Sequence, residues 1–272
     1  MANRSCALEN GVESGSVARV GSAAGSEKLA VIIPTLCEAG NIRTTLDRVR
    51  AALDPIGIDY EILVVDDDSA DETGKIVSAI GEEDPRVRLI VRRGERGVAG
   101  ATLLGWQNTD ATILGAIDAD LQHPPELLPA LVSVIRSGHD VAIGSRYAAG
   151  GSLGDWNPGR KLLSAVALWA ALPVQKRQIR AKDPTSGFFL VRSECLRQVR
   201  LQRTGFKLLL EILVRGHIRS IGEIPYAFKG RDLGTSKAGS RVAREYAWLL
   251  AKLYWERFGL RRLTHSSARA SL

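Results

Sequence analysis

Cysteine is scarce in this 272-residue chain, and long apolar runs are absent. Cys6, Cys37 and Cys195 are scattered and form no CxxC pair, so the sequence supports neither a zinc site nor a disulfide framework. No window reaches the roughly 18 uninterrupted apolar residues expected of a membrane span. These absences indicate a reducing compartment, and we expect a cytoplasmic protein.

Two glycine-rich nucleotide-binding patterns are also missing. The first predicted strand ends in Pro34-Thr35-Leu36-Cys37-Glu38 where a dinucleotide-binding protein would carry GxGxxG, which argues against a nicotinamide-dependent dehydrogenase. The P-loop pattern does not occur either, which disfavours an NTPase. A nucleotide would instead be held by carboxylates that read its base or ribose, and Glu38 and Asp67 are the candidates. Glu38 would also suit plain charge complementarity at a helix N-terminus.

Length and charge bound the class of protein. With 272 residues, 45% of them hydrophobic, the chain can bury one substantial core, which favours one α/β domain with appendages. The net charge of +7 implies an anionic partner, such as a phosphorylated substrate or an anionic membrane surface. Nucleic acid would also suit this charge. It is not an expected partner, because no helix-turn-helix, zinc-finger or RNA-binding aromatic signature occurs.

The two ends of the chain differ in composition from its middle. Residues 1–27 are rich in Ser, Gly and Ala and lack the apolar core of a secretory signal, so they are predicted to form a disordered leader. Residues 241–260 mix aromatic and basic side chains, which predicts an amphipathic helix of the kind that lies on membranes. Residues 261–272 are short and polar, and we expect them to fray.

Strand-like and helix-like segments alternate from residue 28 onward. Short apolar runs predict strands at 29–33, 60–65, 87–91 and 112–117, with helical spacing between them, and a fifth strand at 140–144. The helix after the second of these strands is expected at about 70–80, and a further strand is expected at 186–191. This pattern indicates a mostly parallel sheet with helices on both faces. Ligands bind such sheets beyond the carboxyl ends of the strands. The rule brings four polar clusters to one edge: Pro34–Glu38, Asp66–Asp68, Asp118–Gln122 and Ser145–Tyr147.

The sequence Asp118-Ala119-Asp120 places two carboxylates two residues apart at the end of an apolar run. If both point the same way, they form a hard oxygen site suited to Mg²⁺ or Mn²⁺, which would in turn hold a diphosphate. A solvated turn ahead of a helix is the alternative, and the pair alone does not decide between them. The four clusters at one edge favour the functional interpretation.

A nearly all-apolar segment, 161–174, follows a Gly-rich loop in the second half of the chain. It is too short to span a bilayer and unusually apolar for a surface helix. Two interpretations stay open for it. Either it is buried in the protein or it contacts lipid.

Six motifs occur in order along the chain. They are Pro34-Thr35-x-x-Glu38, Val64-Val65-Asp66-Asp67-Asp68-Ser69-Ala70-Asp71, Asp118-Ala119-Asp120-Leu121-Gln122, Gly144-Ser145-Arg146-Tyr147, Asp183-x-x-Ser186-Gly187-Phe188 and Arg231-x-x-Gly234-x-Ser236-Lys237. Together they resemble the polyprenyl-phosphate (dolichyl-phosphate) mannose synthases, which are family 2 glycosyltransferases of GT-A fold. The resemblance covers roughly residues 28–240, and the ordered set is far more specific than any single motif. It implies a GT-A catalytic domain over that range.

The resemblance also implies a role for individual residues. Pro34, Leu36, Glu38, Val65, Asp67 and the backbone of Ala119 would contact the nucleotide sugar, and Asp118, Asp120 and Gln122 would bind the metal. Arg146, Lys207 and Arg231 would face the donor phosphates and sugar, and Arg146, Arg160 and Ser164 the acceptor phosphate. Asp118, Asp120 and Arg146 form the implied catalytic set. The chain departs from the family in having Leu36-Cys37 where Tyr-Asn is usual, which removes a possible aromatic contact to the base.

The implied reaction is metal-dependent transfer of mannose from GDP-mannose to a polyprenyl monophosphate. That acceptor is already an oxyanion at neutral pH, so it needs positioning more than deprotonation, and in-line attack would invert the anomeric carbon. Two alternatives stay open. One is another donor, such as UDP-glucose or UDP-GlcNAc, on the same class of lipid. The other is a non-enzymatic module that binds nucleotide sugars or an anionic membrane.

A lipid acceptor implies that the protein works at the membrane. Residues 161–174 and the helix at 241–260 are the candidates for docking it peripherally on the cytoplasmic face, although core packing or a partner interface would also account for the second of these. Some members of the family carry membrane helices after this point. Whether a separate membrane-anchor protein is a further partner stays open.

Overall fold

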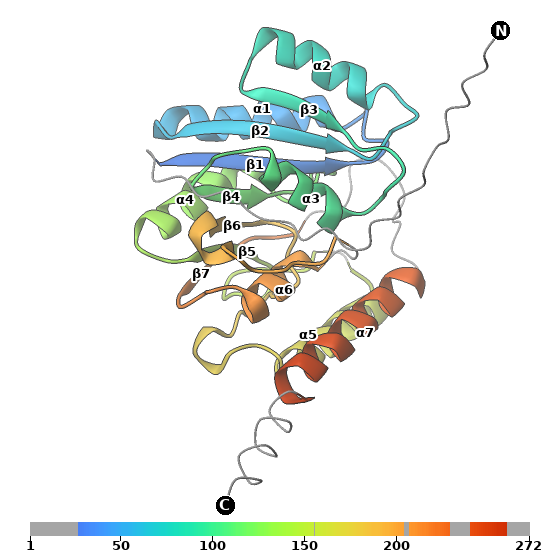
Figure 1. Cartoon of the computed structure of the whole chain (residues 1–272), viewed down its shortest axis with the longest axis vertical. Coiled ribbons are helices and arrows are strands. Elements are labelled where there is room, and N and C mark those ends of the chain that lie inside the picture. The colour runs from blue at the N-terminus through green and yellow to red at the C-terminus, as the bar shows by residue number, and fades with distance from the viewer. Residues whose placement is uncertain (1–26, 155, 204–206, 229–239, 260–272) are drawn as a thin grey trace, which may run out of the picture.

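The computed structural model describes residues 27–259 except 155, 204–206 and 229–239 (Figure 1). Its centre is a seven-stranded sheet in the order β3-β2-β1-β4-β6-β5-β7. The strands are β1 (Lys28–Thr35), β2 (Asp59–Asp66), β3 (Val87–Val91), β4 (Ile113–Ala116), β5 (Val141–Ser145), β6 (Phe189–Arg192) and β7 (Ile221–Pro225). Only β6 in this sheet runs antiparallel to its neighbours β4 and β5. The predicted mostly parallel sheet is confirmed.

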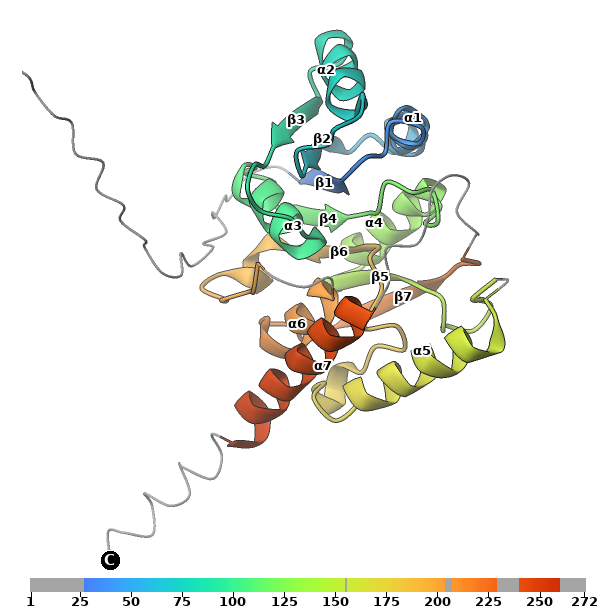
Figure 2. The same cartoon turned by 90° about the vertical axis from the view of Figure 1, so that its right-hand side faces the viewer.

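Helices cover both faces of this sheet, as expected for strands that are apolar throughout. Side chains of α1, α2 and α4 pack in one core cluster, and those of α3 and α6 pack in another on the opposite face (Figure 2). The helices are α1 (Ile42–Leu53), α2 (Thr73–Glu83), α3 (Val98–Gln107), α4 (Leu128–Arg136), α5 (Pro158–Ala171), α6 (Leu208–Arg215) and α7 (Ser240–Tyr254). A five-residue π-helical turn, Trp255–Gly259, follows α7.

The parallel register brings strand ends together at one edge of the sheet. Thr35, the last residue of β1, pairs with Asp66, the last residue of β2, and its hydroxyl donates to the Asp66 carboxylate at 3.0 Å. On the other side of β1, the N–H of Ile117 donates to the carbonyl of Ile32 at 3.1 Å. The loops that follow β1, β2 and β4 therefore leave the sheet side by side.

Helices α5 and α7 pack against each other away from the sheet (Figures 1 and 2). The hydroxyl of Tyr246 donates to Ala167 O at 2.7 Å, and the hydroxyl of Tyr254 donates to Ala170 O at 3.0 Å. Ala171 of α5 is buried in this contact. The other side of α5 is exposed, so neither interpretation of the apolar segment describes all of it: part is packed against protein and part faces outward.

Several element boundaries differ from the sequence-based expectation for local reasons. The strand expected at 186–191 begins at Phe189, because the Ser186 hydroxyl instead donates to Gly144 O at 2.7 Å. The helix expected from residue 70 begins at Thr73, because the Asp71 carboxylate accepts the N–H and the hydroxyl of Thr73. The predicted leader and the frayed tail lie almost wholly outside the described residues. Within the described part of the chain, no helix combines the length and apolarity needed to cross a bilayer.

Candidate active site

All four predicted polar clusters lie at the carboxyl edge of the sheet. The strands that precede them, β1, β2, β4 and β5, run in the same direction, because β6 is antiparallel to both β4 and β5. The prediction that the clusters share one edge is confirmed. The side chains that meet there come from loops far apart in sequence.

The loop after β1 is braced by the loop after β2. The N–H groups of Cys37, Glu38 and Ala39 donate to the side chains of Ser69, Thr73 and Asp71, at 2.7, 2.9 and 3.1 Å. The Glu38 carboxylate accepts a hydrogen bond from the Asn41 amide at 3.0 Å, just ahead of α1. Pro34, Leu36 and Glu38 are half-buried in this loop, which leaves part of each accessible to a ligand.

Asp67 is held by a buried arginine that sequence reasoning did not single out. Nε and Nη2 of Arg92 each donate to one carboxylate oxygen of Asp67 at 2.8 Å, and Gly97 N donates to Oδ2 at 2.7 Å. The φ of Gly97 is 136°, a conformation that requires glycine. Both Asp67 and Arg92 are buried. Two residues before Asp67 in the chain, Val65 is fully buried and packs in the core cluster that contains α3.

The loop after β4 carries the paired carboxylates. Asp120 and Gln122 are buried, the Asp118 side chain is half-buried, and Leu121 between them adopts a left-handed φ of 59° that folds the loop tightly. The N–H of Gln122 donates to Asp120 Oδ1 at 3.2 Å. The Ala119 carbonyl accepts from the Thr45 hydroxyl of α1 at 3.0 Å. The loop is thus fixed both internally and against α1.

Both carboxylates lie near the Tyr226 hydroxyl. Burial raises the pKa of that hydroxyl, and the negative charges of Asp183, Asp118 and Asp120 raise it further, against the opposing charge of Arg146. Gly187 lies against the same place: a Cβ there would come within 2.8 Å of Asp118 Oδ2. The Ser186-Gly187-Phe188 motif therefore needs glycine at its centre, because a side chain would displace the Asp118 carboxylate.

The donor set fits a hard cation that arrives together with a diphosphate. Among the described residues, no three or more His, Cys, Asp or Glu side chains are grouped so as to hold a metal by themselves. Asp118, Asp120 and the Gln122 amide oxygen would supply only part of an oxygen shell. Mg²⁺ usually binds in this way, through one or two carboxylates plus substrate phosphates and water. The residues present therefore fit Mg²⁺ or Mn²⁺.

Arg146 forms a buried ion pair with Asp183, which comes from the loop before β6. Its Nε and Nη2 donate to the two carboxylate oxygens at 2.7 and 2.8 Å, and Nη2 also contacts the Thr185 hydroxyl at 3.2 Å. Burial lowers the pKa of Arg146, but the Asp183 carboxylate outweighs this effect and holds that pKa above its usual value. The rings of Tyr147, Trp156 and Phe228 surround the guanidinium at 5.5–5.8 Å.

Lys207 joins the same cluster from the start of α6. Its ammonium donates to Thr185 O at 3.0 Å, so Lys207 and Arg146 share one neighbouring residue. Burial lowers the pKa of Lys207 to about 8, and the positive charge of Arg146 adds to the lowering. The loop Asp183–Gly187 thereby connects Arg146, Lys207 and Asp118. Three of the predicted site residues therefore meet around the motif Asp183-x-x-Ser186-Gly187-Phe188.

Arg160 and Ser164 lie in the first turns of α5. Arg160 stacks on the Trp156 ring, with its guanidinium carbon 3.9 Å from the ring centroid, and Ser164 Oγ lies 2.6 Å from the Tyr147 hydroxyl. Trp156 in turn meets Phe228 edge-on at 5.4 Å. Tyr147 and Trp156 thus link the predicted acceptor residues to Arg146. Arg231 lies outside the described residues.

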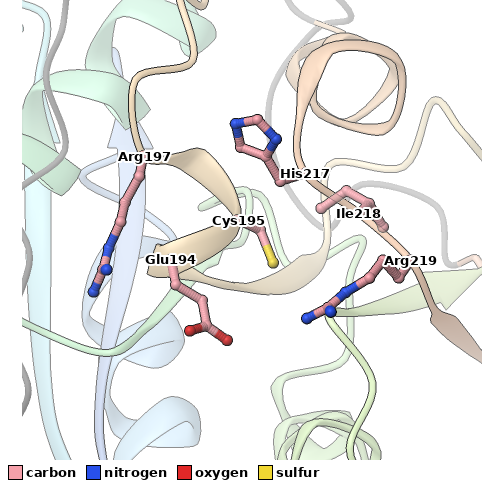
Figure 3. Close-up of a pocket in the computed structure, with 6 residues that line it drawn as sticks. All are labelled: Glu194, Cys195, Arg197, His217, Ile218 and Arg219. Atoms are coloured by element: carbon pink, nitrogen blue, oxygen red, sulfur yellow. The ribbon is translucent and has the colours of Figure 1, made fainter.

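A separate cavity of about 490 Å³ lies at the opposite edge of the sheet (Figure 3). It is lined by Glu194, Cys195, Arg197, His217, Ile218 and Arg219. Its position follows from the antiparallel direction of β6, which ends close to where β4 begins. Figure 3 shows the Arg197 and Arg219 side chains on either side of Glu194, so charges of both signs line the cavity. Burial raises the pKa of the Cys195 thiol to about 12, which leaves it unreactive. None of the predicted site residues lines this cavity.

The family model described as Glycosyl transferase family 2 matches residues 30–200. The chain belongs to this family. It is therefore a glycosyltransferase. Its curated relatives bear out the more specific resemblance to the polyprenyl-phosphate mannose synthases.

Three of these relatives illustrate the extent of the similarity. The dolichol-phosphate mannosyltransferase of Pyrococcus furiosus is 39% identical over 230 residues, which cover 84% of this chain and 64% of that protein. The dolichol-phosphate mannosyltransferase of Saccharomyces cerevisiae is 34% identical over 248 residues, which cover 88% of this chain and 91% of that protein. The undecaprenyl-phosphate mannosyltransferase of Micrococcus luteus is 32% identical over 249 residues, which cover 86% of this chain and 98% of that protein. The chain thus spans less than two thirds of the archaeal protein and nearly all of the bacterial one.

Solved structures agree with the fold. Glucosyl-3-phosphoglycerate synthase from Mycobacterium tuberculosis in complex with Mg²⁺ and UDP has a TM-score of 0.62 and 19% identity, covering 86% of this family 2 chain and 80% of that one. The same enzyme with Mn²⁺, UDP-glucose and phosphoglyceric acid has a TM-score of 0.61 and 21% identity, with 84% and 80% covered. The predicted GT-A fold is confirmed.

Proposed function

We propose that this glycosyltransferase transfers mannose from GDP-mannose to a polyprenyl or dolichyl monophosphate, with a divalent cation and with inversion at the anomeric carbon. One observation carries the proposal. Relatives that are 32–39% identical over at least 84% of this chain are named as mannosyltransferases or mannose synthases of dolichol, undecaprenyl or polyprenol phosphate. Similarity of this extent favours the same acceptor class and the same sugar.

The nucleotide would bind at the carboxyl edge of β1, β2 and β4. Asp67 is suited to accept a hydrogen bond from the base, because Arg92 and Gly97 already fix the direction of its carboxylate. The other predicted contacts are Pro34 and Val65, near the ends of β1 and β2, Leu36 and Glu38 in the loop after β1, and the backbone of Ala119 in the loop after β4. The braced loop after β1 would hold its part of the pocket in place before the donor arrives.

Asp118, Asp120 and Gln122 would hold the cation with the donor diphosphate. When bound, the cation would neutralise the charge that builds up on the leaving nucleoside diphosphate. Lys207 and Arg146 would add positive charge beside the same diphosphate, since both contact Thr185. Arg231 is a further proposed contact to the donor.

The acceptor phosphate would bind between Arg146, Arg160 and Ser164. A phosphate monoester is ionised at neutral pH, so none of these residues has to remove a proton. They have to hold the oxyanion in line with the bond that breaks. Arg160 suits this role because a guanidinium binds phosphate through two parallel hydrogen bonds. Nε and Nη2 of Arg146 already donate to Asp183, so Arg146 would contribute mainly its positive charge. Trp156 would keep Arg160 extended toward the site through their stacking at 3.9 Å.

The outer side of α5 would dock the protein on the membrane that holds the acceptor. Leu162, Leu163, Val166 and Trp169 are all exposed, and Trp169 reaches 78%. The spacing of these residues places them along one stripe of the helix. Arg160 and Ser164 lie on the same helix, roughly half a turn around from this stripe, so an acceptor phosphate bound there would lie within about a helix diameter, roughly 10 Å, of the docked bilayer. Exposed basic residues near both ends of the helix, Lys161 and Arg177, would favour the anionic cytoplasmic face.

The experiment that tests this proposal is a donor panel. The full chain is incubated with a short-chain polyprenyl phosphate and either GDP-mannose, UDP-glucose or UDP-GlcNAc, and the lipid-linked sugar is quantified. We expect GDP-mannose to give the dominant product, with the β configuration that follows from inversion of the α-linked donor. Dominant turnover of a UDP-sugar would refute the choice of donor, and a product with retained configuration would refute direct attack.

The variant Asp120→Asn distinguishes the proposed enzyme from a non-enzymatic module that only binds nucleotide sugars or an anionic membrane. Removal of the carboxylate charge should lower the transfer rate by about 10²-fold or more, because it weakens charge stabilisation at the leaving diphosphate. Vesicle binding should not change. Unchanged turnover in this variant would contradict the metal-centred mechanism.

A further inference from the structure

His123 is a buried histidine whose two ring nitrogens both meet polar partners. Nε2 lies 3.2 Å from Asp118 Oδ2, and Nδ1 lies 2.7 Å from the Tyr226 hydroxyl. The residue is only 3% exposed. An ionised carboxylate can only accept hydrogen bonds, so Nε2 carries the proton toward Asp118. Nδ1 of a neutral ring then accepts from the Tyr226 hydroxyl, and all three groups are satisfied in one chain of hydrogen bonds.

The His123 ring is held on several sides. The rings of Phe188, Tyr226 and Phe228 lie 5.5–5.7 Å from it, centroid to centroid. Tyr226 is itself fixed through its backbone, since its N–H donates to Ser145 O at 3.1 Å and its carbonyl accepts from Ser152 N at 3.1 Å. The imidazole therefore has little freedom to turn away from Asp118.

The Asp118 carboxylate is the more accessible of the two. Its side chain is 38% exposed, whereas Asp120 as a whole is only 6% exposed and its Oδ1 accepts a hydrogen bond within its own loop. Gly187 limits the Asp118 carboxylate on one side, because the position of a Cβ there would lie 2.8 Å from Oδ2. His123 contacts that same oxygen. The carboxylate is thus confined between a glycine backbone and an imidazole.

We infer that His123 is a positioning residue, which holds Asp118 in the orientation that binds the cation and its diphosphate, and that Tyr226 holds His123. This inference rests on the metal site of the proposed function. A hydrogen bond to a metal-binding carboxylate sets its direction, and removal of such a partner typically costs about 10- to 100-fold in metal affinity. His123 would act without contacting the cation or either substrate.

A pair of substitutions separates this role from simple packing. Glutamine at position 123 places its amide nitrogen about where Nε2 lies and can still donate to Asp118. Asparagine is shorter, so its amide lies about where Nδ1 lies. It can still form a hydrogen bond with Tyr226 but does not reach Asp118. Both variants lose the aromatic ring, so each controls for the packing lost in the other. The measurement is a calorimetric titration of Mn²⁺ into the full chain with GDP present and, separately, with UDP, alongside thermal unfolding without metal.

We expect His123→Asn to weaken Mn²⁺ binding by about 10-fold or more, and His123→Gln to stay within about 3-fold of the unsubstituted chain. Tyr226→Phe should give an intermediate loss. The two position-123 variants should unfold at similar temperatures. Equal Mn²⁺ affinity in all variants would overturn the inference, and so would equal losses in the Asn and Gln variants.

The same titration distinguishes the failure of this inference from that of the proposed function. If the unsubstituted chain binds no Mn²⁺ in the presence of either GDP or UDP, the metal site itself is refuted and the inference fails with it. If it binds Mn²⁺ tightly and His123→Asn does so equally, only the inference fails. If the expected pattern appears but GDP-mannose gives no lipid product, the positioning role stands and the choice of donor fails.

Discussion

The Arg146–Asp183 ion pair is the most completely buried charge pair of the site. Both side chains are at most 7% exposed, and both carboxylate oxygens accept hydrogen bonds from the guanidinium. Removal of one partner would leave the other charge buried and uncompensated. We predict that Asp183→Asn lowers the free energy of unfolding by about 3–5 kcal/mol, measured by urea denaturation. The exposed pair Lys75–Glu72 is the control, and Glu72→Gln should change stability by about 1 kcal/mol or less.

The pH dependence of this pair has a definite sign. Burial raises the pKa of Asp183, but hydrogen bonds and positive charge from Arg146 outweigh burial and hold the pKa below its usual value of 3.8. The stabilisation is therefore complete above about pH 4 and is lost as the pH falls through the lowered pKa. The stability difference between the unsubstituted chain and Asp183→Asn should shrink below pH 4. A difference that grew toward acid pH would contradict this assignment.

Lys207 gives a second prediction in pH, at the alkaline end. Its pKa of about 8 means that the ammonium loses its proton as the pH rises from 7 to 9. If the charged form binds the donor diphosphate, kcat/KM for the donor should fall with an apparent pKa near 8, since this ratio reports the free enzyme. Lys207→Arg keeps its charge throughout and should lose this alkaline limb. The same limb in both proteins would exclude Lys207 as its source.

Cys37 adopts a left-handed φ of 57° in the loop after β1. A left-handed φ is sterically unfavourable for most residues other than glycine, and asparagine tolerates it better than most of them. We predict that Cys37→Asn raises the free energy of unfolding by about 0.5–1 kcal/mol. Cys37→Ser keeps the same steric conflict and should show no comparable gain. A loss of stability in the Asn variant would mean that the thiol makes a contact that outweighs the backbone cost.

The residues that sequence reasoning missed share one property, which is a partner far away in the chain. His123 and Tyr226 are 103 residues apart, and Arg92 and Asp67 are 25 apart. Motif spacing locates the ends of strands. It carries no information about which side chain from another loop will arrive there. Trp156, whose ring meets Phe228, is missed for the same reason.

At the scale of the element, apolar runs predict the strands well because both faces of the sheet are covered and nearly every residue of a central strand is buried. The direction of a strand within the sheet is not predicted by its apolar run. The run at 189–192 has the composition of its neighbours, but it lies antiparallel between β4 and β5, and periodicity cannot reveal this. The consequence is functional. The reversal of β6 brings the loop before it, Asp183–Gly187, to the edge that holds Asp118.

Helix α5 is the element with the clearest separable role. We predict that the double variant Leu162→Gln, Trp169→Gln weakens binding to anionic lipid vesicles by about 10-fold, because it removes two exposed apolar side chains from the proposed docking face. Vesicle co-sedimentation measures this. Transfer to a water-soluble, short-chain acceptor should be unchanged. The control is Val91→Gln, an exposed apolar residue at the far end of the sheet on β3. Equal losses in both variants would refute a specific docking face.

At the scale of the whole molecule, the sequence predicts that four loops share one edge because parallel strands impose it. It does not predict how tightly the loops are joined. The Asp183–Gly187 loop links Arg146, Lys207 and Asp118, while the ring of Trp156 links Arg160 to Phe228 and so to His123. The proposed donor and acceptor sites are therefore one connected body, built from segments on both sides of the reversed strand.

The central claim is that acidic side chains at this edge act through a divalent cation on a leaving nucleoside diphosphate. The most direct test measures lipid-linked mannose formed from GDP-mannose and a short polyprenyl phosphate before chelation, after chelation, and after Mg²⁺ or Mn²⁺ is restored. We expect product formation to cease on chelation and to return with the cation. Product formed at an undiminished rate in excess chelator would contradict the account.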